Sequence, residues 1–139
     1  MMDRIEELLQ SPYWIIDILP EQVPKDSPGQ YFAVEKYFLQ NKRLAEIKQK
    51  HLHLILKLNC YREMRIAGEA SVQPSPDHIA EEMRKGHLCL MTGESMILSE
   101  PDDTHLTVFN PDPKLLELIK TIAPAEGLFV WAPSRRSEL

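Results

Sequence analysis

Apolar positions recur every three or four residues in several stretches of the chain, which is the spacing typical of a helix with one buried face. This spacing predicts helices over residues 2–10, 31–39, 42–50 and 76–85, and a last helix between Pro113 and Pro124. The fourth of these has the clearest limits, because Ser75 can cap its first turn and Gly86 can end it.

Alternating apolar positions predict the strands. The aromatic and β-branched run Tyr13–Leu19 is one of them. The strongest alternation lies in residues 51–66, HLHLILKLNCYREMRI, where five side chains share one strand face: Leu52, Leu54, Leu56, Leu58 and Cys60. Three shorter runs with turns between them predict an antiparallel meander at His87–Met91, Ser95–Leu98 and Thr104–Asn110. Residues 128–132, LFVWA, give a final strand.

Helices and strands are mixed along the chain without strict alternation, which favours the α+β class over a parallel α/β fold. We expect a mostly antiparallel sheet of five or six strands, with helices packed mainly on one face. A length of 139 residues is typical of one domain. Residues 1–132 are therefore expected to form a single compact domain, and residues 133–139 a frayed polar tail.

Composition and charge limit the kinds of partner. The 21 acidic and 16 basic side chains give a net charge of −5, and no long basic run is present, so nucleic-acid binding is not expected. No stretch has the apolar length of a membrane span, and residues 1–10 lack the apolar core of a signal peptide. We expect a cytoplasmic protein, with its two cysteines reduced. The five glycines form no phosphate-binding loop, so no cofactor is expected.

Asp17 is the first candidate for chemistry, because it is the one carboxylate in the apolar run SPYWIIDILP. In a dry site its pKa would rise, and it could act as a general acid or base. The alternative is a structural carboxylate that faces water or pairs with Arg62, Arg65 or Lys57. We favour the paired structural role, since unpaired charges are rarely buried.

Four aromatic residues flank the long proline-rich loop of residues 20–30: Tyr13, Trp14, Tyr31 and Phe32. They could line a groove that binds a peptide or a small organic ligand. The alternative, which we favour, is that Trp14 and Phe38 belong to the core, while Pro20, Pro24 and Pro28 stiffen a loop laid over the sheet. Among the functional interpretations, the aromatic groove has the most residues behind it.

Two histidine patterns are weaker candidates. On a strand, His51 and His53 would project to the same face and could begin a metal site, although no third ligand follows from the spacing. His87 lies two residues before Cys89, and a cysteine–histidine pair could make a thiolate nucleophile. The simpler interpretation of His51 and His53 is the solvent face of a strand whose other face is leucine. Side chains two residues apart on a strand stand parallel and do not converge, so His87 and Cys89 are more simply ordinary strand residues.

The sequence therefore favours a domain that binds a protein partner or a small ligand, for example an acidic immunity or inhibitor protein, and does not catalyse a reaction. The alternative is a small enzyme with Asp17, a histidine and Cys89 in a cleft near the proline-rich loop. Edge strands of an open sheet could also pair two copies into a homodimer.

Overall fold

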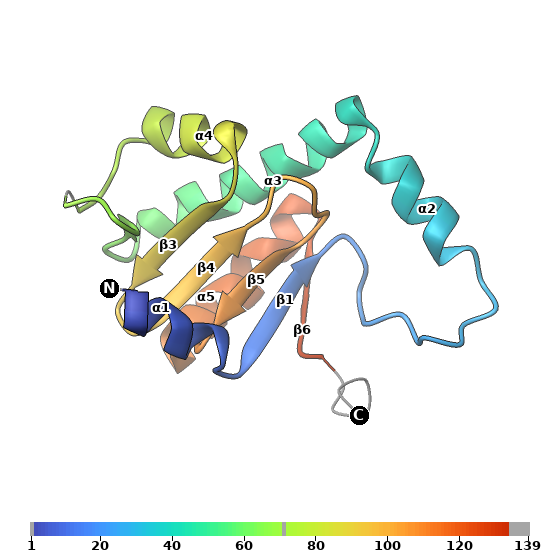
Figure 1. Cartoon of the computed structure of the whole chain (residues 1–139), viewed down its shortest axis with the longest axis horizontal. Coiled ribbons are helices and arrows are strands. Elements are labelled where there is room, and N and C mark those ends of the chain that lie inside the picture. Colours follow the sequence, from blue (N-terminus) through green and yellow to red (C-terminus); the bar gives the residue numbers. More distant parts are fainter. Residues whose placement is uncertain (1, 71, 134–139) are drawn as a thin grey trace.

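The computed structural model describes residues 2–70 and 72–133, in which one antiparallel sheet is packed against helices (Figure 1). The six strands lie in the order β2-β3-β4-β5-β1-β6, and each neighbouring pair is antiparallel. The strands are β1 (Tyr13–Asp17), β2 (Arg65–Ile66), β3 (Leu88–Thr92), β4 (Ser95–Ser99), β5 (Leu106–Phe109) and β6 (Phe129–Trp131). The helices are α1 (Met2–Leu9), α2 (Tyr31–Phe38), α3 (Asn41–Asn59), α4 (Pro76–Lys85), α5 (Pro113–Ile122) and the short 3₁₀ helix η1 (Ala123–Glu126). The predicted α+β class is confirmed.

The main core lies between one face of the sheet and helices α3, α4 and α5. Ile16 and Val108 point into it from β1 and β5, and both are fully buried. The helices contribute Leu54 and Leu58 from α3, Ile79 and Met83 from α4, and Leu115 and Ile119 from α5. The prediction that helices pack mainly on one face is thus confirmed.

The opposite face of the sheet is only partly covered. Helix α1 lies across it (Figure 1), and Leu8 packs there against Met91, Met96 and Phe109 in a second, smaller cluster. Cys89 and Leu98 lie beside this cluster and are only partly buried. An apolar part of the sheet face therefore remains open next to α1.

The strand predicted at residues 51–66 is wrong, because most of this segment belongs to the 19-residue helix α3. The buried side chains of α3 are Ile47, His51, Leu54, Ile55 and Leu58, which recur at helical spacing. Leu52 and Leu56 flank this stripe and are partly buried. Leucine is a strong helix former, and residues 41–59 contain no glycine or proline that would end the helix. Only Arg65 and Ile66 pair with the sheet, opposite Met91 and Leu90.

Residues 18–30 connect β1 to α2 without regular secondary structure, as the proline content predicts. Helix α2 has no buried residue and contacts α3. Of the described helices, none combines the length and the apolar character that crossing a membrane requires. The predicted polar tail, apart from Pro133, falls outside the described residues.

Candidate functional site

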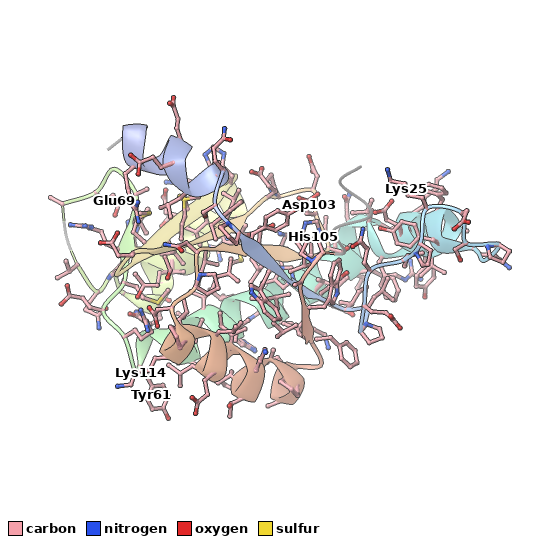
Figure 2. All side chains as sticks on the ribbon, turned by 90° about the horizontal axis from the view of Figure 1, so that it is seen from below. Lys25, Tyr61, Glu69, Asp103, His105 and Lys114 are labelled. Carbon is pink, nitrogen blue, oxygen red and sulfur yellow. The ribbon has the colours of Figure 1, made fainter. Side chains whose placement is uncertain are left out.

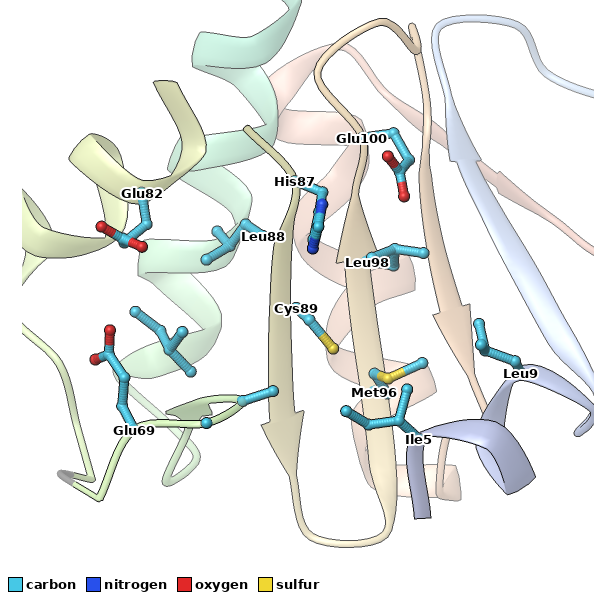
Figure 3. Close-up of a pocket in the computed structure, with 13 residues that line it drawn as sticks. Ile5, Leu9, Glu69, Glu82, His87, Leu88, Cys89, Met96, Leu98 and Glu100 are labelled. Atoms are coloured by element: carbon cyan, nitrogen blue, oxygen red, sulfur yellow. The ribbon is translucent and has the colours of Figure 1, made fainter. Parts of the chain in front are cut away.

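A groove of about 620 Å³ lies on the open face of the sheet (Figure 3). Its floor is apolar and comes from Cys89 on β3 and from Met96 and Leu98 on β4. Helix α1 forms one side with Ile5 and Leu9. The segment that follows β2 and the helix α4 form the other side, so three separate regions of the chain enclose the groove.

The strands expose an apolar floor because β3 and β4 are apolar on both faces. In β4, Ile97 points into the main core, while Met96 and Leu98 point to the opposite face. Cys89 is paired with Leu98 across the two strands. The short turn between the strands is closed by Gly93, whose φ of 58° lies in the left-handed region that favours glycine.

Three carboxylates stand around this apolar floor, and among the described residues no lysine or arginine lines the groove. Glu69 accepts a hydrogen bond from His78 Nε2 at 2.9 Å when that nitrogen is protonated, and Glu82 pairs with Lys85 Nζ at 3.1 Å. The carboxylate of Glu100 has no ion pair within the described part of the chain. The groove therefore combines an apolar floor with a negatively charged rim.

Cys89 and His87 both line the groove, as Figure 3 shows. Burial raises the pKa of the Cys89 thiol above its ordinary value. A catalytic cysteine needs the opposite shift, because the thiolate is the nucleophile. The position of Cys89 therefore suits an apolar floor better than a covalent mechanism.

Asp17 lies at the end of β1, beside a second cavity of about 30 Å³ that Tyr31, Glu35 and His105 also line. The side chain is buried, and its Oδ1 accepts a hydrogen bond from Ile18 N at 2.7 Å. Burial raises the pKa of Asp17, while this hydrogen bond and the charge of His105 oppose the rise. A cavity of this size has room for a water molecule but not for a substrate.

The cations expected to pair with Asp17 are placed elsewhere. Arg62 binds Asp112, with 2.5 Å between Nη2 and Oδ2, and Lys57 pairs with Glu126. No ion pair of Asp17 occurs among the described residues. The predicted pairing of Asp17 with Lys57, Arg62 or Arg65 is thus wrong, because residues 41–59 form a helix and not a strand beside β1. Arg65 does lie on a strand, but β3, β4 and β5 separate β2 from β1.

The structure does not bring the four candidate aromatic residues together. Tyr13 packs in the cluster below α1, whereas Trp14 points to the helix-covered face, with Lys120 Nζ 4.4 Å from its ring centroid. Tyr31 lines the small cavity beside Asp17, and Phe32 is 79% exposed. Neighbouring residues of a strand face opposite ways, which is why Tyr13 and Trp14 separate.

The two candidate metal ligands also separate, because they lie on a helix. His51 is fully buried, and neither ring nitrogen has a hydrogen-bond partner of good geometry. Burial, together with the charges of Lys48 and His105, lowers the pKa of His51 to about 3, so its ring is neutral. His53 is exposed, with Nδ1 3.5 Å from an oxygen of Glu126. Within residues 2–70 and 72–133, no group of three or more potential ligands could hold a metal ion.

The groove residues were missed from the sequence, apart from Cys89 and His87. Glu69, Glu82 and Glu100 lie in different segments, and no spacing along the chain connects them. Comparisons with family models, with curated proteins and with solved structures found no match to this chain. Its function is therefore inferred from the geometry of its surface.

Proposed function

We propose that this protein acts by binding, and that its groove takes an apolar segment of a partner protein that carries basic side chains. The observation that carries this proposal is an apolar floor with Glu69, Glu82 and Glu100 around it and, within the described part of the chain, no lysine or arginine in its lining. An acidic immunity or inhibitor protein remains one specific form that such a binding domain could take.

The apolar surface supplies the attraction. Leu9 is 49% exposed at the side of the groove, next to the partly buried Leu98 and Cys89. Fully burying a leucine-sized side chain stabilises a complex by about 1.5–3 kcal/mol, so two or three such contacts can hold a short segment. Contiguous apolar surface with a polar rim is typical of protein-binding sites.

The rim supports the choice of a basic partner. Glu100 has no ion pair within the described residues, so a lysine or arginine can bind its carboxylate without breaking an ion pair, although the charge of Glu100 already acts on Lys48. The net charge of −5 also attracts a basic partner over longer distances. Such charges mainly set specificity and the rate of association.

The enzyme alternative has less support. Asp17 and His105 meet beside a water-sized cavity, while Cys89 lies in the groove, so the three proposed groups share no cleft. Convergence of polar groups around a substrate-sized cavity is what catalysis would require.

Selection of peptides from a random display library against the immobilised protein tests the proposal. The selected sequences should combine apolar residues with lysine or arginine. Their binding should be lost in Leu9→Asp, because a carboxylate in the groove opposes burial of the apolar segment. The control is Phe32→Asp on α2, which places the same charge at a more exposed apolar site outside the groove.

A charge variant separates the two parts of the site. Glu100→Gln should weaken binding of the selected peptides and make it less sensitive to salt. Glu46→Gln, an exposed site on α3, should leave binding unchanged. Peptides that bind Leu9→Asp as well as the native protein, or that lose affinity only in Phe32→Asp, would contradict the groove as the binding site.

A further inference from the structure

A third cavity, of about 270 Å³, lies between α3, α4 and the turn that follows β4. Its lining is mostly apolar, with polar and charged side chains from both helices: Asn41, Leu44, Ala45, Lys48, Gln49, Leu52, Ala80, Met83, Arg84 and Pro101. Of the residues that the structure describes, no aspartate or glutamate lines it, in contrast to the groove on the opposite face. At about 30 Å³ for each water in the liquid, its volume equals about nine waters and suits a molecule of a few carbon atoms.

Lys48 lines this cavity, and two uncharged groups at the end of β4 hold its amine. Its Nζ lies 3.2 Å from Ser99 Oγ and is also bonded to the main-chain oxygen of Glu100. No carboxylate forms an ion pair with Lys48 among the described residues, although the side chain is partly buried. A neutral amine has two N–H groups and one lone pair. Ser99 and Glu100 can accept both N–H groups, which leaves the lone pair available for bonding.

The surroundings also increase the neutral fraction of this amine. Burial lowers the pKa of Lys48 to about 8, against the opposing charges of Asp103, Glu100 and Asp102. A group with this pKa is about one-tenth neutral at pH 7, whereas an ordinary lysine is neutral in less than about one molecule in a thousand. Desolvated lysines of this kind act as nucleophiles toward carbonyl groups.

Arg84 supplies a second recognition group in the same cavity. It lies on α4, and its guanidinium has no ion pair within the described part of the chain. A guanidinium presents paired N–H groups that match the two oxygens of a carboxylate. The cavity thus joins a lysine in an apolar setting to a group that recognises carboxylates.

We propose that this cavity binds a small carbonyl compound that carries a carboxylate, with Lys48 forming an imine and Arg84 binding the carboxylate. The Lys48 nitrogen bonds to the carbonyl carbon, and the carbonyl oxygen leaves as water with the two amine hydrogens. No electrons are exchanged in this step. Protonation of the imine gives a cation, which the nearby carboxylates of Asp103, Glu100 and Asp102 stabilise.

Reductive trapping of the full-length protein tests this proposal. The protein is incubated with glyoxylate and cyanoborohydride, and modified lysines are located by peptide mass spectrometry. Lys48 should gain one carboxymethyl group at least about ten times faster than Lys42, because the cavity holds its amine and burial lowers the pKa of Lys48 to about 8. Lys42 is a suitable internal reference, since it is exposed on the same helix.

The variant Arg84→Gln tests the recognition of the carboxylate. It should slow trapping of glyoxylate at Lys48 several-fold and leave trapping of acetaldehyde, which has no carboxylate, unchanged. Equal slowing with both aldehydes, or no slowing with glyoxylate, would overturn the role of Arg84. Modification of Lys48 no faster than Lys42 would overturn the whole proposal.

Discussion

At the scale of single residues, Arg62 connects segments that lie far apart in the sequence. Its Nε donates to Thr92 Oγ1 at 3.1 Å, and its Nη1 and Nη2 donate to the two carboxylate oxygens of Asp112 at 3.0 and 2.5 Å. Asp112 also caps α5, since its Oδ1 accepts from Leu115 N at 2.8 Å. The pair therefore fixes the start of α5 against the end of β3.

Asp112→Asn should lower the free energy of unfolding at pH 7 by about 1–2 kcal/mol, because asparagine keeps the cap but loses the charge opposite Arg62. The hydrogen bonds from Arg62 hold the pKa of Asp112 below its ordinary 3.8. Their stabilisation is therefore complete above pH 3.8 and is lost as the pH falls through the folded-state pKa. Urea unfolding over this range measures the difference, with Asp77→Asn as the control for charge removal near a helix N-terminus. If the free energy of unfolding changed with pH in the same way for the native protein and for Asp112→Asn, this account would be contradicted.

At the scale of elements, local signals predicted α4 and the first half of α3, residues 42–50, and failed for the second half of α3. Ser75 caps α4 by accepting from His78 N at 3.2 Å, and the helix ends before Gly86, as the sequence predicts. In residues 51–59, every second residue from Leu52 to Leu58 is a leucine, which fits a strand. Leu54 and Leu58 also belong to the buried stripe of the helix, so this short segment fits both structures. The helical spacing of buried residues already begins at Ile47, before the alternating leucines, and this longer pattern indicates a helix.

The difference between helix and strand can be measured with two leucine variants. Leu54 is fully buried and Leu56 is only partly buried. Leu54→Ala should destabilise the protein by about 2–5 kcal/mol in urea unfolding, and Leu56→Ala by less than about half as much. A strand would place both side chains on one face, so equal losses would contradict the assignment of α3.

At the scale of the whole molecule, the sheet has one face covered by α3, α4 and α5 and another that α1 covers only in part. Figure 2 shows α1 on one side of the sheet and α3 and α5 on the other. The class, the antiparallel pairing and the uneven helix packing followed from the order of elements. The groove did not, because Glu69, Glu82 and Glu100 meet only through the tertiary packing. Strand β6 lies at an edge of the sheet, so the pairing of two copies through an edge strand into a homodimer stays a prediction.

The two cysteines allow the binding role of the groove to be measured directly. Cys89 lies on its floor, and Cys60 is exposed elsewhere, so the alkylation rates of both thiols can be followed by mass spectrometry in one sample. A library-selected peptide, at about ten times its dissociation constant, should slow alkylation of Cys89 about tenfold and leave Cys60 unchanged. An unchanged rate at Cys89 under saturating peptide, or equal slowing at both thiols, would contradict binding in the groove.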